Sequence, residues 1–501
     1  MPSSTANPNR MLLLSTLAFT VCFAAWMING VLVTFLTNNG IFKWSATQTG
    51  WLLGAPVLMG SILRLPVGVL TDKYGGKWMM TILLLLGALP MYLLSMANSY
   101  GSFLLLSFAF GIAGSSFAAG VAYTTQWFPK ERQGTALGIF AMGNVGAAAT
   151  TFFAPRLLDT FTQGNTVPDG WRMLPQLYAA VLAATAVIFF LFTVNKRSGA
   201  VKSMAARLAP LKQTRVWRFG LYYFFVFGSF VALSQWLIPY YVNVYALSIV
   251  AAGMMTTAFS LPSGLVRMVG GLLSDKYGAR IVLIRVFTVA IVCLVFLIPP
   301  RVEMHTPGQG IMAARPGVVE AITADQITVA DPANPADKTV YPLRTADPMG
   351  IRFGIHHDEE GFLPMPFTSV WQDPQVQVGE TVGKGQLLAK GTTHIYFQAN
   401  KWIFTFLVFI IGAAMGIGGA AVFKLIPDYY PDDVGTVGGI VGVLGGLGGF
   451  AGPILFGMLL AATGVWTTCW LLLLVVAVAC ALWMRSVLRR MARHTPSRRM
   501  P

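Results

Sequence analysis

Charged residues are scarce in this sequence. Only 11% of its 501 residues are Asp, Glu, Lys or Arg, whereas 55% are hydrophobic and the mean hydropathy is +0.64. A water-soluble chain of this length would need a much larger charged fraction to cover its surface. The composition therefore indicates a protein whose solvent is lipid, and it disfavours a soluble multidomain protein.

Cysteine and histidine are also rare. All four cysteines lie inside apolar runs, which disfavours a disulfide framework or a zinc site, and we predict that they are packing residues: Cys22, Cys293, Cys469 and Cys480. The five histidines lie outside those runs: His305, His356, His357, His394 and His494. We therefore predict no metal, no cofactor and no enzymatic site at membrane depth.

Long apolar runs are what the sequence does contain. Stretches of about 20 residues, each able to cross a hydrocarbon core of ~30 Å as a helix, recur along the whole chain. We count about twelve, which predicts an all-α polytopic membrane protein. The first run, from Met11 to Leu36, is too long for the apolar part of a signal peptide, and we expect it to be retained as the first helix.

The net charge of +16 has a distribution that predicts orientation. Basic residues gather at Arg10, in a linker at residues 196–216 and in a tail at residues 486–501, and all three fall on one side if there are twelve crossings. The positive-inside rule places that side and both termini in the cytoplasm. The positive charge is thus explained by membrane orientation, and we predict no nucleic-acid partner. The compact loops suit a bacterial inner membrane.

An internal repeat divides the chain into halves. RLPVGVLTDKYGGK at Arg64–Lys77 matches RMVGGLLSDKYGAR at Arg267–Arg280, and each copy ends the second span of its half. We predict two pseudo-symmetric six-helix bundles, residues 1–195 and residues 217–302 with 401–485. The pattern resembles the loop signature of the major facilitator superfamily, in which Gly75 and Gly278 are expected at positive φ.

A polar stretch at residues 303–400 interrupts the second half. It is too long for an ordinary connection, and its 11 acidic against 6 basic residues give it a net charge of about −5. We expect a small extracytoplasmic domain rich in β-strands. VQVGETVGKGQLLAKG at Val376–Gly391 resembles a lipoyl-like barrel-sandwich, but no lysine occurs between Lys338 and Lys384 to carry a prosthetic group.

Two arginines lie at membrane depth. Arg64 and Arg267 each precede the aspartate at the end of their span by eight residues, which is ~12 Å of helix. A buried arginine is costly, on the order of 2.5–3.5 kcal/mol, and all 19 acidic residues lie at span ends, in loops or in the insertion. We predict that a small oxyanion neutralises the pair; the alternative is that each arginine snorkels or donates to backbone carbonyls.

Two glycine-rich runs occupy equivalent spans of the two halves. They are GIFAMGNVGAAATTFFAP at residues 138–155 and GTVGGIVGVLGGLGGFAGP at residues 435–453. Together with the arginine pair they closely resemble the signatures of the nitrate/nitrite porter family. The resemblance implies nitrate or nitrite between Arg64 and Arg267, and it assigns these further site residues: Asn144, Gly143, Tyr223, Phe117, Phe423, Gly438, Gly442 and Gly445.

The same resemblance implies alternating access, with the two halves rocking about the site. Because no histidine or carboxylate lies within a span, we favour nitrate/nitrite exchange by a monomer that serves a cytoplasmic nitrate reductase. A proton-coupled nitrate symporter and a carrier of another small anion or organic solute remain alternatives. An anion sensor or a carrier-domain enzyme is less well supported, because no output module or prosthetic-group lysine is present.

Overall fold

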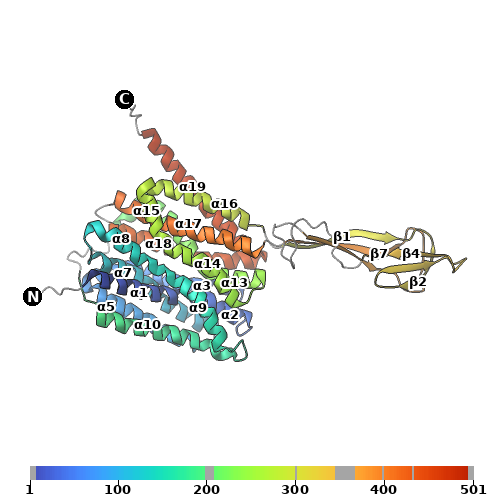
Figure 1. Ribbon diagram of the computed structural model, residues 1–501, viewed down its shortest axis with the longest axis horizontal. Helices are drawn as coiled ribbons and strands as arrows, with labels where there is room; N and C mark the ends of the chain where they lie inside the picture. The colour runs from blue at the N-terminus through green and yellow to red at the C-terminus, as the bar shows by residue number, and fades with distance from the viewer. Residues whose placement is uncertain are drawn as a thin grey trace, which may run out of the picture. The chain divides into compact units, whose positions relative to one another are not determined.

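The computed structural model describes residues 7–197, 208–299, 302–344, 367–397, 400–430 and 434–494. The chain divides into two compact units, Met1–Ile298 with Thr405–Pro501, and Pro299–Phe404. The first unit consists of helices and the second mainly of strands (Figure 1). The neighbouring histidines His356 and His357 lie outside the described residues.

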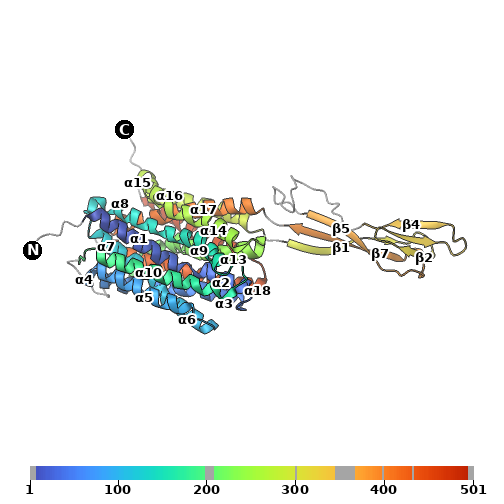
Figure 2. The same cartoon turned by 60° about the horizontal axis from the view of Figure 1, so that its bottom comes forward.

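The helical unit is a bundle in which the long helices run side by side in both views (Figure 2). Its first half contains α1 (Pro8–Trp26), α2 (Asn29–Asn38), α3 (Ala46–Ile62), α4 (Arg64–Tyr74), α5 (Gly76–Leu94), α6 (Tyr100–Phe110), η1 (Gly111–Ser115), α7 (Ser116–Thr125), α8 (Lys130–Ala141), η2 (Met142–Val145), α9 (Gly146–Phe161), η3 (Pro168–Arg172) and α10 (Met173–Phe192).

Its second half contains η4 (Ala209–Lys212), α12 (Thr214–Tyr223), η5 (Phe224–Gly228), α13 (Ser229–Tyr245), α14 (Ile249–Leu265), α15 (Arg267–Tyr277), α16 (Ala279–Leu297), α17 (Lys401–Tyr429), α18 (Val434–Thr463) and α19 (Thr468–His494). The cysteines predicted to be packing residues are buried free thiols.

The number of membrane spans agrees with the sequence. Among the described residues, ten helices are long and apolar enough to cross a membrane, and the number rises to twelve if each of two bent pairs counts as one span. The bent pairs are α3 with α4, at 40°, and α14 with α15, at 44°. The chain is therefore a helical, multi-pass membrane protein.

Proline accounts for part of the two bends. Pro66 lies in the first turn of α4, where its missing N–H leaves the carbonyl of Ile62 without its usual helical partner. In the second copy Pro262 lies inside α14, just before the break at Val266. Both second segments end at the predicted glycines: Gly75 has φ +95° and Gly278 has φ +85°, values that side-chain-bearing residues rarely adopt.

The unit Pro299–Phe404 contains two antiparallel sheets. One has the strand order β1 (Val302–Met312), β7 (Leu387–Phe397), β5 (Phe367–Pro374); the other has the order β4 (Lys338–Pro342), β3 (Gln326–Ala330), β2 (Gly317–Ile322), β6 (Thr381–Val382). Buried apolar side chains, among them Val319, Ile327, Val382 and Leu388, form a core of their own. This core gives the unit a source of stability separate from that of the bundle.

Candidate anion-binding site

Each arginine of the repeat begins the second segment of a bent helix pair. Arg64 is the first residue of α4 and Arg267 the first residue of α15, immediately after the breaks at Leu63 and Val266. Both side chains are buried, with exposed fractions of 3% for Arg64 and 7% for Arg267. Neither side chain snorkels out to an interface, so that alternative is wrong.

One aromatic ring brings the two cations together. The guanidinium carbon of Arg64 lies 5.2 Å from the ring centroid of Phe227, and that of Arg267 lies 5.6 Å from the same centroid. The two guanidinium carbons therefore lie no more than roughly 11 Å apart, and at an effective dielectric of ~20 two such charges repel by at least about 1.5 kcal/mol. Phe227 itself is buried, on the π-helical segment η5.

The protein compensates these charges only in part. Arg64 donates from Nη1 to the carbonyl oxygen of Gly442 at 2.6 Å, so the alternative of a backbone acceptor holds for one bond. Within the described residues Arg267 has no hydrogen bond and neither arginine has an ion pair, and both Nε atoms are buried without a partner. Aromatic rings add cation–π stabilisation: the guanidinium carbon of Arg64 also lies 5.5 Å from the Phe117 ring centroid and 5.8 Å from that of Trp26.

The predicted aromatic residues form one cluster beside the arginines. Tyr223 stacks on Phe227 with ring centroids 4.9 Å apart, and it meets Phe423 edge-on at 5.0 Å. Phe423 also meets Phe117 edge-on at 6.3 Å. The structure thus brings Tyr223, Phe117 and Phe423 to the arginine pair.

The predicted glycines lie at different places. Gly442 contacts Arg64, and a Cβ built on Gly445 would lie 2.2 Å from Cδ1 of Tyr223, so only glycine fits under that ring. A Cβ built on Gly438 would lie 3.6 Å from Cε1 of Phe423, an ordinary contact distance. Gly143, by contrast, packs against Phe19, which makes it a helix-packing position instead of a contact to the arginines.

Asn144 is buried on η2. Its Nδ2 donates to the carbonyl oxygen of Ala141 at 2.9 Å, whereas its Oδ1 has no partner among the described residues. This side chain is therefore held by its own helix, and no direct contact with either arginine is present.

Departures from the regular α-helix gather around these residues. Phe117 follows the 3-10 segment η1, Asn144 lies on the 3-10 segment η2, and Tyr223 and Phe227 flank and occupy the π-helical η5. Together with the breaks before the two arginines, they place irregular backbone at the level of the site. Such segments in membrane helices are tolerated mainly where they line a functional interior.

Sequence reasoning missed Trp26 and Phe227. A signal for Phe227 was present, because it lies four residues after Tyr223 and so shares a helix face with it. Trp26 ends α1, where its Nε1 donates to the carbonyl oxygen of Pro56 at 2.8 Å. Nothing in its local sequence points to Arg64.

The two halves pack unequally along the bundle. We call the end with Gly75 and Gly278 the inner end and the opposite one the outer end. Toward the outer end, a Cβ on Gly50 of α3 would lie 2.5 Å from the carbonyl oxygen of Pro453 on α18, and one on Gly457 would lie 2.3 Å from that of Ala46. Backbones of opposite halves therefore touch there.

Three glycines toward the inner end lack close neighbours. A Cβ built on Gly134 or Gly138 of α8, or on Gly435 of α18, would meet no neighbouring atom within 4 Å. The close backbone contacts at Gly50 and Gly457 thus lie toward the outer end, whereas Gly134, Gly138 and Gly435 toward the inner end have no such contact.

The two copies of the repeat end in different contacts. In the first copy Nδ2 of Asn195 donates to the carbonyl oxygen of Tyr74 at 2.9 Å, and its Oδ1 fills the space beside Gly75. In the second copy Gly278 faces open space, and Asp275 forms an ion pair at 2.6 Å with Lys424, next to Phe423 on α17. The second copy is thus connected to the aromatic cluster through α17.

Comparison with known proteins identifies a family. The model described as Major Facilitator Superfamily matches residues 14–314 and 386–500. The "Probable nitrate/nitrite antiporter NarK1" of Thermus thermophilus is 37% identical over 97% of this chain and 94% of its own length. The "Nitrite extrusion protein" of Bacillus subtilis (strain 168) is 29% identical over 61% of this chain and 75% of its own length.

Solved structures agree on the fold. A bacterial homologue of the human lysosomal transporter Spinster, in an inward-facing and occupied conformation, has a TM-score of 0.65 at 14% identity, covering 99% of this chain and 100% of that one. The nucleoside transporter NupG has a TM-score of 0.57 at 12% identity, covering 96% of this chain and 98% of that one. At such identities the likeness concerns the fold alone.

Proposed function

The chain belongs to the major facilitator superfamily and, within it, to the nitrate/nitrite porters, and we propose that it exchanges nitrate for nitrite at the Arg64–Arg267 pair. Nitrate and nitrite are its substrates, as the names of its relatives indicate. It is a transporter and not an enzyme. The observation that carries the site proposal is the burial of two arginines around one ring without a carboxylate partner in the described chain.

An anion between the two guanidinium groups relieves their repulsion. Each group can offer a planar fork of N–H donors, which matches the planar oxygens of nitrate better than the point charge of lysine does. One N–H donor of Arg64 is already hydrogen-bonded to the carbonyl oxygen of Gly442, whereas Arg267 forms no hydrogen bond within the described residues. In this proposal Tyr223 donates its hydroxyl to the anion, Phe117 and Phe423 form walls, and Asn144, Gly143, Gly438, Gly442 and Gly445 shape the surrounding helices.

Alternating access follows from the unequal packing of the halves. In this proposal the contact between Gly50 and Pro453 belongs to a closed outer end, and the lack of close neighbours at Gly134, Gly138 and Gly435 supports an inner end through which the anion passes. In the opposite state the inner glycines, Gly134, Gly138 and Gly435, come into contact and the outer ones separate. Because these surfaces carry no side chain at the contact, the same helices can form and break a close interface.

Exchange is favoured over proton coupling by the absence of a titratable relay at the site. No histidine or carboxylate contacts either arginine among the described residues, so an empty site keeps its repulsion and resists reorientation. When nitrate is carried in one direction and nitrite in the other, an anion neutralises the arginine pair in both crossings, and the repulsion no longer opposes reorientation. A proton-coupled nitrate symporter remains the second candidate, since a proton can accompany the anion through water, and a carrier of another small anion or organic solute is the third.

The organisation of the chain completes the proposal. Residues 1–195 form the first six-helix bundle, 196–216 a cytoplasmic linker, 217–302 with 401–485 the second bundle, and 486–501 a cytoplasmic tail. Residues 303–400 form an extracytoplasmic domain related to the lipoyl-like barrel-sandwich, supported by the two small sheets in that range. The protein acts as a monomer in a bacterial inner membrane, with both termini cytoplasmic, beside a cytoplasmic nitrate reductase.

Counterflow in proteoliposomes tests the proposal. Vesicles are loaded with nitrite, labelled nitrate is added outside, and the unmodified protein is compared with Arg64→Lys and Arg267→Lys; Arg10→Lys, on an exposed arginine at the start of α1, is the matched control. We expect uptake that needs internal nitrite and is lost in both site variants but kept in the control. Uptake into nitrite-free vesicles under a pH gradient would establish symport instead, and wild-type uptake by both lysine variants would remove the arginine pair from the mechanism.

A further inference from the structure

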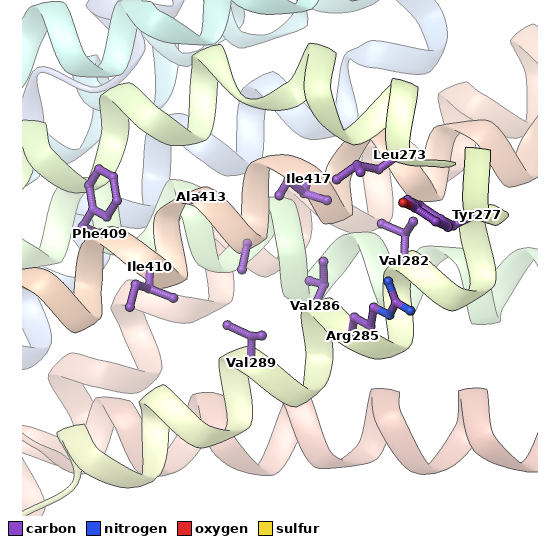
Figure 3. A pocket seen from close by; sticks show the side chains of 11 residues that line it. Leu273, Tyr277, Val282, Arg285, Val286, Val289, Phe409, Ile410, Ala413 and Ile417 are labelled. Atoms are coloured by element: carbon purple, nitrogen blue, oxygen red, sulfur yellow. The ribbon is translucent and has the colours of Figure 1, made fainter. Parts of the chain in front are cut away.

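A crevice separates α16 from α15 and α17, away from the arginine pair. It has a volume of about 290 Å³, and it is lined mainly by apolar side chains, among them Leu273, Val282, Val286, Ala413 and Ile417 (Figure 3). Glycines explain why α17 leaves this space. Gly412 and Gly416 place α17 against the backbone of α14, and Gly270 of α15 receives Ile417, so α17 is held toward α14 and α15. It meets α16 at Gly418, where a Cβ would lie 3.0 Å from Cγ1 of Val286, at one wall of the crevice.

The crevice opens toward the surroundings of the bundle. Val289, Phe409 and Tyr277 on its rim have exposed fractions of 41%, 43% and 42%. Short side chains, chiefly valines on α16 and alanines on α17, leave a gap that no side chain of the protein fills. In a membrane helix such an opening faces hydrocarbon, so an occupant there must be apolar over most of its length.

One end of the crevice is cationic. Arg285 lies beside Tyr277, with its guanidinium carbon 5.6 Å from the ring centroid, as Figure 3 shows at the end opposite Phe409. Arg285 has no hydrogen bond or ion pair within the described residues. The nearest acidic residue of the repeat loop, Asp275, is already paired with Lys424. The charge of Arg285 is therefore available to an external anion.

The position of Arg285 matches the level of a phospholipid head group. It is six residues into α16, or ~9 Å from the start of the helix, and its long side chain extends to Tyr277 at the end of α15. Lys276 and Arg280 lie at the same end of α15 and α16 and add to the positive charge. An apolar slot with an unpaired arginine at its mouth is complementary to one lipid molecule. The slot matches the acyl chain, and the arginine matches the phosphate.

We propose that this crevice binds an anionic phospholipid, with one acyl chain along α16 and α17 and the phosphate against Arg285. A zwitterionic lipid offers the same chain but places a cation near Lys276 and Arg280, so the site prefers an anionic head group. A lipid here packs against the same α17 that carries Phe423 to the anion site. Lipid binding in the crevice does not depend on anion transport.

Native mass spectrometry of the purified full-length protein tests this. Phosphatidylglycerol and phosphatidylcholine with the same acyl chains are titrated into delipidated samples of the wild type, Arg285→Gln, Ala413→Leu and Arg10→Gln. Arg10 is the matched control, because it also lies against an aromatic ring, Phe192, at 5.4 Å, but lines no part of the crevice. Helix content and melting temperature without added lipid establish that each variant is folded.

We expect one phosphatidylglycerol to be retained by the wild type and Arg10→Gln at concentrations where phosphatidylcholine dissociates. Arg285→Gln should lose the preference, and Ala413→Leu, which fills the slot without changing charge, should lose retention of both lipids. Equal retention of the two lipids by the wild type, or wild-type retention by either crevice variant, would overturn the proposal. A dimer that Ala413→Leu abolishes would assign the crevice to a second copy of the chain.

Discussion

Substituting Gly50 by alanine should shift the protein away from the state that the structure represents. The added Cβ would lie 2.5 Å from the carbonyl oxygen of Pro453 and 3.0 Å from Cα of Ile454, whereas ordinary contact begins at 3.4 Å. Both obstacles are backbone atoms, so α3 and α18 must move apart by roughly 1 Å. Overpacking of this kind costs about 1–3 kcal/mol, and each 1.4 kcal/mol is a tenfold change in an equilibrium.

The cost falls only on the state with the outer end closed. Gly50→Ala should therefore favour the outward-open state by about 5- to 150-fold and slow nitrate/nitrite counterflow, which needs both states. Gly138→Val should act in the opposite direction, because that position is open here and must pack when the inner end closes. Gly101→Ala, at an exposed position on α6 without neighbours within 4 Å, is the control.

Spin labels report the shift directly. With labels at Thr166, in the loop after α9, and at Thr463, the last residue of α18, both of them exposed, pulsed electron paramagnetic resonance measures the separation of the halves at the outer end. We expect Gly50→Ala to increase the population of longer distances relative to the wild type, and Gly101→Ala to leave the distance distribution unchanged. If Gly50→Ala keeps the wild-type distance distribution and exchange rate, the outer glycine contacts do not close this transporter.

Three further predictions concern the site and the insertion. Tyr223→Phe should raise the KM for nitrate about 2- to 10-fold in counterflow, because one neutral hydrogen bond contributes ~0.5–1.5 kcal/mol; an unchanged KM would exclude the hydroxyl as a ligand. Counterflow should be nearly flat between about pH 6 and 8, since no histidine contacts either arginine in the described chain, and a steep profile would favour proton coupling. Residues 299–404 expressed alone should melt cooperatively by circular dichroism, and Leu388→Ala, at a fully buried position, should lower the stability by ~2–5 kcal/mol; a non-cooperative wild-type melt would show that the unit needs the bundle.

The membrane fold was predictable because its signals are local and repeated. Each span is an apolar run, and the duplicated sequence around Arg64 and Arg267 predicts the division into halves. Positive φ at Gly75 and Gly278 also followed from the sequence and is confirmed. These features depend on residues that are close together in the chain.

The surroundings of the arginines were harder to predict, since they depend on contacts between distant helices. Trp26 and Phe227 reach Arg64 from α1 and η5, and the acceptor of its hydrogen bond is a carbonyl on α18, 378 residues away in sequence. Composition also could not distinguish the role of Gly143, which packs against the Phe19 ring, from that of Gly442, whose carbonyl oxygen accepts a hydrogen bond from Arg64. A glycine run predicts close approach but not which neighbour approaches.

Two of the contacts that hold the repeat loops differ in kind, and they respond differently to ionic strength. Asn195 holds the first loop through a neutral amide that fits against Gly75, whereas Lys424 and Asp275 hold the second through an ion pair that is partly open to solvent. Dissolved ions screen charges over ~8 Å at physiological ionic strength and over ~3 Å at 1 M, but they leave an amide hydrogen bond nearly unchanged. A rise in ionic strength should therefore weaken the contact between Lys424 and Asp275, through which the second loop reaches α17, while it leaves the hydrogen bond of Asn195 in the first loop nearly unchanged.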